Sequence, residues 1–290
     1  MLIQQLLNGV LSSGVYALYA VGFTMIFGIM GVLNMAHADF GTVAAFVIIW
    51  AVSAGLAPIG TMLIACAATL VIALMVERLA LRPGRRFKGD AAIEMPLIGT
   101  IGASMMLQNT AALVFGNKAM VFPYSLRGFM RIGGLLVSKG LLVSLSTSAV
   151  LLVLLEILVT HTGFGRQMRA VAQNRNAAEI MGIHSEGVIL MTFTITAALA
   201  GIAGGLVGLS YGLVSPYMAV SYAIKGLVAM IVGGVGSLPG AVLGALLIGI
   251  VEALTVSAFG SQMRDVGVFV VLMAVLAIRP SGLLRVAANR

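Results

Sequence analysis

A short polar interruption between two apolar runs holds residues that could contact a polar solute. Residues 33–39 read Leu-Asn-Met-Ala-His-Ala-Asp and contain Asn34, His37 and Asp39. Ionisable groups at membrane depth are costly and usually face a cavity or a partner, so these side chains are candidates for lining a translocation pathway. The alternative is a connecting turn at the membrane interface, where a histidine and an aspartate cost little.

Proline and glycine surround a second candidate segment, between residues 211 and 240. Tyr211 and Pro216 precede a short apolar piece, Lys225 lies inside it, and Gly234 and Gly236 follow it. This pattern favours a broken or re-entrant helix whose free backbone groups meet a passing solute. We predict that the five residues line the pathway. A pair of ordinary loops would give the same pattern.

The other ionisable residues favour neither an enzyme nor a metal site. Glu156 and Glu252 fall inside apolar segments; we expect Glu156 near the interface, and for Glu252 we favour an ion pair over a proton relay. His161 and His184 flank a loop without converging, and Cys66 is the only cysteine. The sequence has no Gly-Lys pair and therefore no P-loop. We expect no cofactor on this chain, and ATP would be used by another subunit.

The segment 161–187 is too polar to span a membrane and too regular for a linker. We predict one amphipathic helix over residues 165–173 and a second capped by Asn176, with Glu179 returning the capping bond and Gly182 ending it. Apolar knobs are expected from Phe164, Met168, Val171, Ile180, Met181 and Ile183. Such a surface suits a partner protein, and it equally suits a helix lying on anionic lipid.

The composition requires a membrane-embedded scaffold for these residues. Of 290 residues, 60% are hydrophobic and 9% are charged, against about 25% charged in soluble domains. We predict an all-α polytopic bundle, one transmembrane domain over residues 1–290, with eight or nine crossings. The expected helices are 5–30, 36–55, 59–80, 95–116, 139–160, 188–210, 223–235, 240–258 and 262–279. Residues 1–36 carry no charge, so we expect the first segment to be retained rather than cleaved.

Glycine spacing and basic clusters constrain how these helices pack and face. Glycines four residues apart, such as Gly204 and Gly208 or Gly240 and Gly244, predict close helix contacts in the second half. Three basic clusters favour one cytoplasmic face. They are Arg78, Arg82, Arg85, Arg86 and Lys88; Arg166, Arg169 and Arg175; and Arg279, Arg285 and Arg290. The opposite loop also carries Lys118, Arg127, Arg131 and Lys139. The net charge of +8 is thus explained by basic residues in the loops of a membrane protein, and we expect no nucleic-acid partner.

Four segments resemble one known family along nearly the whole chain. They run from Gly14 to His37, from Gly165 to Ile183, from Gly233 to Ala241 and from Arg279 to Leu283. The chain is similar to the branched-chain amino-acid permeases of bacterial ATP-binding-cassette importers, specifically the H-type subunit of the Liv systems. The resemblance implies a half-channel in the bacterial inner membrane. Its implied partners are a second related permease, two cytoplasmic ATPase subunits and an external solute-binding protein.

The resemblance also implies a role for the polar loop. In the family, the matching loop is the coupling element that sits in a cleft of the ATPase. The coupling residues implied here are Gly165, Arg166, Arg169, Asn174, Asn176, Glu179, Met181 and Gly182.

One departure from the family concerns the pathway segment. The family usually has Gly after the Ala-His pair, whereas Ala38 and Asp39 follow it here. The solute therefore stays open among branched-chain amino acids, urea, short amides and aromatic acids. An ion-coupled secondary transporter is a further alternative, disfavoured by the scarcity of acidic residues inside the apolar segments.

Overall fold

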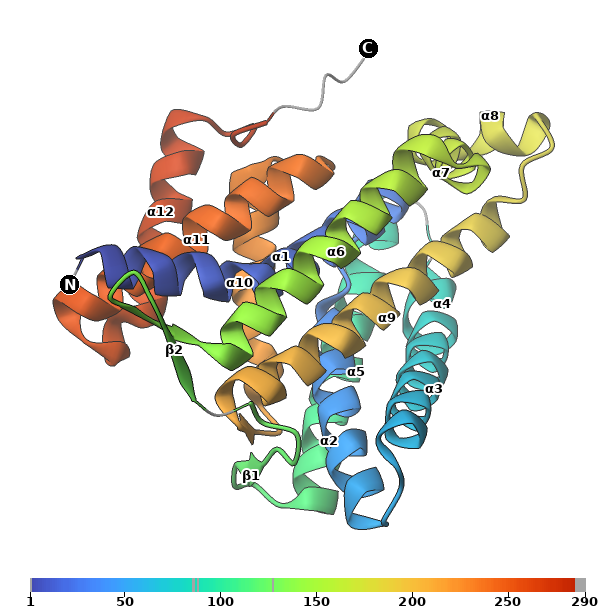
Figure 1. Ribbon diagram of the computed structural model, residues 1–290. Coiled ribbons are helices and arrows are strands. Elements are labelled where there is room, and N and C mark those ends of the chain that lie inside the picture. Colours follow the sequence, from blue (N-terminus) through green and yellow to red (C-terminus); the bar gives the residue numbers. More distant parts are fainter. Residues whose placement is uncertain (1, 85–86, 88, 127, 285–290) are drawn as a thin grey trace.

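The structure is a computed structural model and describes residues 2–84, 87, 89–126 and 128–284 (Figure 1). The helices are α1 (Leu2–Met30), η1 (Met35–His37), α2 (Asp39–Ser53), α3 (Pro58–Val76), η2 (Glu77–Leu81), α4 (Arg82–Gly84), α5 (Ala91–Phe115), α6 (Lys139–His161), α7 (Gly163–Gln173), α8 (Arg175–Ile180), α9 (Ser185–Tyr211), α10 (Met218–Gly233), α11 (Leu238–Phe259), η3 (Ser261–Met263) and α12 (Arg264–Ile278). The strands are β1 (Met120–Val121), β2 (Phe129–Ile132), β3 (Leu135–Ser138) and β4 (Leu213–Val214).

The predicted membrane helices are confirmed. Eight helices of the described chain are long and apolar enough to cross a membrane, and α10, with 16 residues, is a shorter apolar helix. Each of the nine predicted ranges overlaps one long helix, and three of them also take in a short helical segment, η1, η2 or η3. Long apolar runs can satisfy their backbone groups in hydrocarbon only within a helix. The chain is therefore a multi-pass, all-α membrane bundle.

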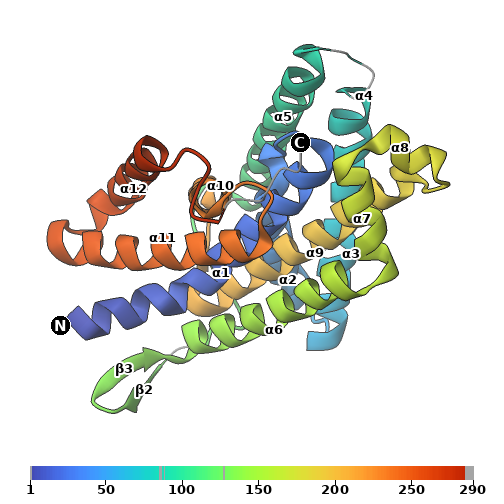
Figure 2. The ribbon, with the colours of Figure 1, turned by 90° about the horizontal axis from the view of Figure 1, so that it is seen from above.

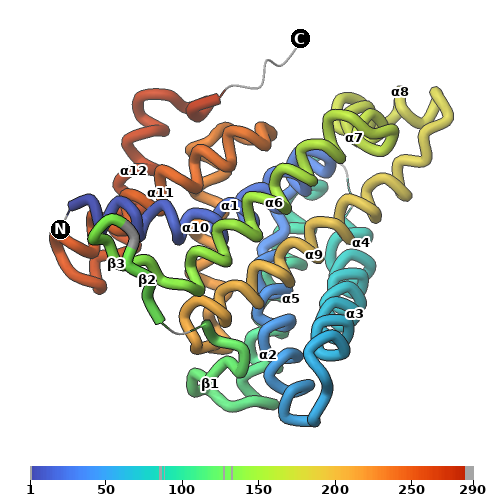
Figure 3. Tube along the Cα trace, in the orientation of Figure 1, coloured from blue at the N-terminus to red at the C-terminus, as the bar shows by residue number. Residues whose placement is uncertain are grey.

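Helix α1 forms the centre of the bundle. It packs against α6, α9, α10 and α11, and its side chains from Val15 to Met25 are almost entirely buried. Figures 2 and 3 show α11 and α6 running alongside it, with α12 outside α11. Tyr16, Tyr19 and Phe23 are among its fully buried side chains. A central helix that buries tyrosine hydroxyls must supply them with partners or leave them unpaired.

Glycine contacts bring α2 and α9 together. A Cβ placed on Gly204 would lie 2.0 Å from the carbonyl oxygen of Gly41, so neither helix could approach the other with larger side chains. The same holds for Gly233 of α10 and Gly240 of α11, where the corresponding distance is 2.0 Å. By contrast, a Cβ on Gly205 would meet only Ile48 at 3.6 Å. The predicted close packing is confirmed for the glycines that face a neighbouring helix.

Two small strand pairs were not predicted. Gly133 and Gly134, with φ of +58° and +85°, join β2 to β3 in a two-residue hairpin, a conformation that favours glycine. Strand β1 pairs with β4 after α9. Gln4 ties the hairpin to the start of α1 through bonds of 2.6 and 2.9 Å to the backbone of Leu136. These strands lie in polar connections between helices.

The two ends of the bundle differ in what they carry. Helices α4, α7 and α8 lie at one end, which we call the α7–α8 end; the N-terminus, β1, β2 and β3 lie at the opposite, hairpin end (Figures 1 and 2). Arg78, Arg82 and the basic residues of α7 and α8 thus share one end, as the clusters predicted. Arg85, Arg86, Lys88, Arg127, Arg285 and Arg290 lie outside the described residues.

Candidate functional site

The chain between α1 and α2 turns back into the bundle. Gly31, at φ +67°, ends α1, and η1 follows within a few residues. Asn34 caps η1 by accepting a hydrogen bond of 3.1 Å from the N–H of Ala36, and the Met35 N–H donates to Thr100 Oγ1 at 3.2 Å. Irregular backbone at membrane depth is tolerated only where protein or a water-filled cavity surrounds it. The interruption predicted at residues 33–39 is therefore a buried break, not an exposed turn.

His37 occupies a hollow in α1 that only glycine provides. A Cβ on Gly22 would lie 2.2 Å from Nε2 of His37. The imidazole ring packs edge-on against Phe23 and Phe40, with ring centroids 4.9 and 6.3 Å away. Gly22 lies eight residues before the end of α1, so His37 sits about 12 Å inside that end. Its ring is held inside the bundle by aromatic contacts.

Several polar atoms around this break have no hydrogen-bond partner among the described residues. They are the hydroxyl of Tyr19, Nδ2 of Asn34, both ring nitrogens of His37 and Oγ1 of Thr42. Leaving a buried donor or acceptor unpaired costs about 1–3 kcal/mol. Such groups are rare in stable cores, so their concentration at the junction of α1, η1 and α2 favours a surface that meets water or a polar solute in another conformation.

Asp39 begins α2 and is joined to α5 by two polar side chains. Ser104 Oγ donates to Oδ2 of Asp39 at 2.5 Å, and Gln108 Nε2 donates to Oδ1 at 3.0 Å. Gln108 Nε2 also donates to Ser104 Oγ at 3.0 Å, which closes a triangle of three side chains. Asp39 is only 1% exposed. Ser104 and Gln108 were not predicted as site residues.

Lys225 is held in an ion pair between α10 and α11. Its Nζ lies 2.9 Å from Oε1 of Glu252, and Arg264 Nε lies 3.1 Å from the same oxygen. Lys225 Nζ also lies 5.1 Å from the ring centre of Tyr16 and 5.9 Å from that of Tyr222. The ion pair expected for Glu252 is thus confirmed. Tyr222 also contacts Tyr19 at 5.7 Å, so an aromatic row links the surroundings of Lys225 to those of His37.

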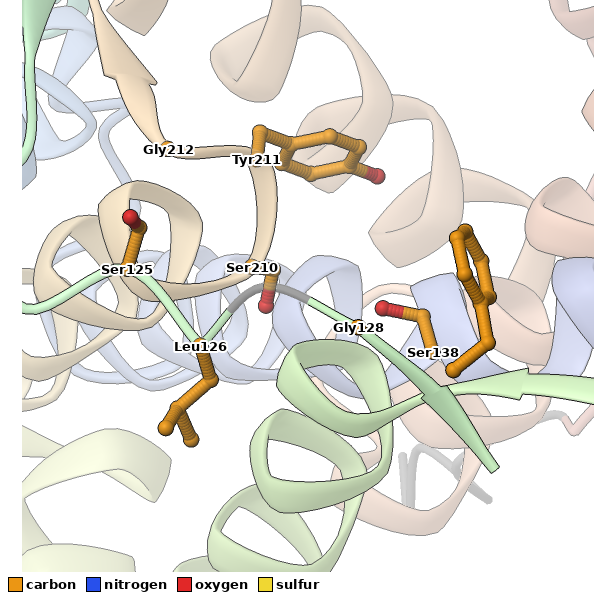
Figure 4. Close-up of a pocket in the computed structure, with 8 residues that line it drawn as sticks. Ser125, Leu126, Gly128, Ser138, Ser210, Tyr211 and Gly212 are labelled. Atoms are coloured by element: carbon orange, nitrogen blue, oxygen red, sulfur yellow. The ribbon is translucent and has the colours of Figure 1, made fainter.

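Among the remaining predicted pathway residues, Tyr211 interacts with Tyr16 of α1 and with Glu252 and so lies next to this ion pair, whereas Pro216, Gly234 and Gly236 lie in turns. Tyr211 lines a pocket of about 210 Å³ at the hairpin end, where Figure 4 shows its ring together with Ser138 and Ser210. Pro216 is buried in the turn between β4 and α10. Gly234 and Gly236, at φ +111° and +87°, form the turn between α10 and α11. The structure therefore spreads the predicted pathway over the hairpin end, the middle and the far end of α10.

Helix α7 is fastened to the end of α6. The Thr162 hydroxyl caps it by accepting a bond of 3.2 Å from the N–H of Gly165. A Cβ on Gly165 would lie 2.0 Å from the carbonyl oxygen of Val159, and the guanidinium of Arg169 donates to that same oxygen. The side chain of Arg169 is thus hydrogen-bonded to α6. Met168 and Val171 are buried against the bundle, so they anchor α7 and the prediction that they are exposed knobs was wrong.

Helix α8 begins at a different residue from the predicted one. Asn174, with extended backbone, accepts a bond of 3.0 Å from the N–H of Ala177, so Asn174 is the cap and the assignment of Asn176 was wrong. Glu179 pairs with Arg175 at 3.1 Å instead of returning a capping bond. Arg175 also reaches Glu186 of α9 at 2.5 Å. Partial burial lowers the pKa of Arg175, but the hydrogen bonds and charges of these two glutamates raise it by more. The pKa of Arg175 therefore lies above its ordinary value.

The tip beyond α8 presents bare apolar side chains. Ile180 and Met181 are 86% and 82% exposed, and Gly182, at φ +83°, ends the helix as predicted. Arg166, Asn176 and Glu179 are exposed around them, and Asn174 at the cap is exposed as well. A projecting apolar pair with a polar rim is a form suited to a pocket on another protein.

Comparison with known proteins decides the family. Residues 5–278 match the family described as branched-chain amino acid transport system / permease component. The chain belongs to this family. It is 36% identical to the high-affinity branched-chain amino acid transport system permease protein BraD of Pseudomonas aeruginosa, over 97% of this chain and 95% of BraD. Identity to the permease protein LivH of Escherichia coli K12 is also 36%, with the same shares of each chain.

A solved structure supports the fold independently. The structure titled PsaBC from Streptococcus pneumoniae in complex with Fab aligns with 94% of this chain and 91% of its own chain, with a TM-score of 0.51 at 11% identity. At that identity the likeness concerns the fold alone. The family is a permease family, and this permease chain is a multi-pass membrane protein.

Sequence reasoning missed the partners of several predicted residues. Gly22 and the tyrosines of α1 carry a local signal, because they lie in the segment that resembles the family. The sequence gives no such signal for Ser104, Gln108 and Arg264, because a single polar residue in an apolar helix need not belong to a site. Only the packing of α5 on α2 and of α12 on α11 assigns them.

Proposed function

We propose that this chain is a permease subunit of an ATP-driven importer that carries branched-chain amino acids across a bacterial inner membrane. It would pair with a second related permease, two cytoplasmic ATPase subunits and an external solute-binding protein. The family membership over residues 5–278 carries this proposal, together with the relatives' names as high-affinity branched-chain amino acid permeases.

The buried break between α1 and α2 supports passage of a polar solute. The unpartnered atoms of Asn34, His37 and Tyr19 are buried inside the bundle, as is the side chain of Asp39. In a closed conformation these groups face protein, and in an open one they can meet the solute's polar groups or water. Tyr211 and Pro216 would lie toward the external mouth in this arrangement, and Gly234 and Gly236 toward the internal side.

The fastening of α7 and α8 supports a coupling role. The module formed by residues 162–186 is joined to α6 by Arg169 and to α9 by Arg175. A docked ATPase that moved the tip at Ile180 and Met181 would therefore move two membrane helices with it. The end that carries this module would face the cytoplasm, as the basic clusters favour.

Reconstitution tests the proposal directly. The complete importer in liposomes should take up radiolabelled leucine only with ATP on the ATPase side and with loaded binding protein on the other. Liposomes holding this chain without the ATPases should show no uptake, and an imposed proton or sodium gradient should not restore it. Gradient-driven uptake by the chain alone would instead identify a secondary transporter. ATP-driven uptake of urea, a short amide or an aromatic acid in place of leucine would change the solute while keeping the class.

Two substitutions probe the coupling assignment. Arg169→Ala removes the bond to Val159, and Glu179→Gln removes the charge that pairs with Arg175. We expect both variants to insert into the membrane and to lower uptake per ATP hydrolysed. Normal uptake by both variants would show that this loop is not the coupling site.

A further inference from the structure

The side chains of Asp39, Ser104 and Gln108 form an anionic site between α2 and α5. We propose that this triangle binds the ammonium group of the amino acid as it passes; the inference rests on the proposed function. The carboxylate supplies the charge, and the hydroxyl and amide hold it in place.

Asp39 is a buried anion without a cation. No lysine, arginine or histidine of the described residues forms an ion pair with it. A carboxylate offers about four lone-pair sites, and Ser104 and Gln108 occupy two of them. Buried charges are otherwise paired, so the free acceptor positions and the missing positive charge fit a primary ammonium ion as ligand.

A neighbouring hydroxyl provides an independent sign of a ligand. Thr42 follows Asp39 by three residues, so both side chains project from the same face of α2. Its Oγ1 is buried and has no hydrogen-bond partner in the described chain. The buried hydroxyls of Thr24, Thr69 and Thr192 behave differently, each donating to the carbonyl four residues before it. The hydroxyl of Thr42 thus has no partner among the described residues and lies on the same face of α2 as the carboxylate.

The position of the triangle on α5 gives it access from outside the bundle. Pro96 and Thr100 are the buried residues of α5, whereas Ser104 and Gln108 are half-buried. Ser104 lies near the middle of this 25-residue helix, about 20 Å from its start, and Asn109 next to Gln108 is exposed. Hydrocarbon does not suit such a polar flank. The flank therefore fits a passage completed by the second permease.

An experiment can distinguish the ammonium group of the amino acid from a sodium ion as the cation that binds Asp39. In the complete importer in liposomes, Asp39→Asn keeps the size of the side chain and removes its charge. We expect leucine uptake to fall about tenfold or more, as for loss of a charged hydrogen bond, while ATP hydrolysis stimulated by loaded binding protein stays within about twofold. Glu156→Gln, which neutralises an acidic residue of α6, should leave both rates unchanged. Replacing sodium by choline should also leave wild-type uptake unchanged.

The other outcomes would overturn the inference. Normal leucine uptake by Asp39→Asn would do so while leaving the proposed function intact, whereas a wild-type importer that takes up no leucine would fail at the proposed function itself. Loss of wild-type uptake without sodium would assign the site to that ion. If Asp39→Asn fails to assemble while Ser104→Ala and Gln108→Ala assemble, the carboxylate is structural.

Discussion

The ion pair between Lys225 and Glu252 gives a stability prediction that is unequal for its two partners. The side chains are 2% and 7% exposed, and Nζ lies 2.9 Å from Oε1. At an effective dielectric constant of about 20, unit charges at this separation attract by roughly 6 kcal/mol, which the cost of desolvation partly offsets. Glu252→Gln leaves the buried lysine with Tyr16 and with Asp265 at 4.0 Å. We expect it to lower the free energy of unfolding by about 3–5 kcal/mol.

Removing the lysine should cost less. After Lys225→Met, Glu252 keeps Arg264 at 3.1 Å, whose side chain is 44% exposed. The carboxylate is then still paired with a partly hydrated cation, and we expect a loss of about 1–3 kcal/mol. The double variant, Lys225→Met with Glu252→Gln, should be more stable than Glu252→Gln alone, because no buried charge is left unpaired.

Unfolding of the purified chain in mixed micelles by increasing fractions of sodium dodecyl sulfate, followed by circular dichroism, would measure these differences. Asp265→Asn is the matched control, since this carboxylate is 53% exposed and should matter by less than about 1 kcal/mol. Equal stabilities of Glu252→Gln and wild type would refute the reasoning. A Lys225→Met variant that is less stable than Glu252→Gln would refute the assigned order.

Three further predictions concern packing and coupling. Gly204→Ala places a Cβ 2.0 Å from the carbonyl of Gly41 and should cost about 1–3 kcal/mol in the same titration. Gly205→Ala, whose Cβ would meet only Ile48 at an ordinary contact distance of 3.6 Å, should not destabilise the chain. The Cβ added by Gly165→Ala overlaps the end of α6, so this variant should lower ATP-driven uptake about tenfold in liposomes. Gly163→Ala is the control, since its Cβ would meet only a side-chain nitrogen at 3.8 Å, and it should leave uptake unchanged. Equal uptake by the two variants would contradict the attachment of α7 to α6. Ile180→Asp should weaken co-purification of the ATPase subunits by about tenfold or more, and unchanged recovery would argue against the tip as the docking surface.

The helices could be predicted because the solvent dictates them. Apolar runs such as residues 139–161 have one way to satisfy their backbone in hydrocarbon, so composition alone locates them. The break near His37 could also be located, since polar residues there interrupt two apolar runs. Its depth could not, because the hollow opposite Gly22 exists only once α1 and η1 are packed together.

Local rules failed where two assignments satisfied them equally. Asn174 and Asn176 are both good caps, and Glu179 stands three residues after Asn176 as a capping box requires. The end of α7 at Gln173 decided between them, because the next residue must leave the helical conformation and Asn174 does so with φ −156°. A cap thus depends on where the preceding helix stops.

The partners of Asp39 illustrate the larger limit. Ser104 and Gln108 are separated from it by 65 and 69 positions, and one turn of α5 presents both to the carboxylate. In sequence, a serine and a glutamine four residues apart in an apolar helix indicate only a shared helical face. The charge that makes them a site lies on another helix, so the chemistry is set by packing.

Helix α1 connects the proposed coupling module, residues 162–186, with the proposed pathway around His37. At the α7–α8 end, caps and arginines bind the module to α6 and α9, and α7 also packs against α1. A displacement of the tip is therefore passed to α1 instead of being absorbed in a loose joint. Along α1, about 12 Å from that end, lie Gly22 and the unpaired atoms of Tyr19 and His37. Movement thus reaches the place where few hydrogen bonds hold the packing closed, and a small shift there exchanges unpaired protein contacts for contacts with water or solute.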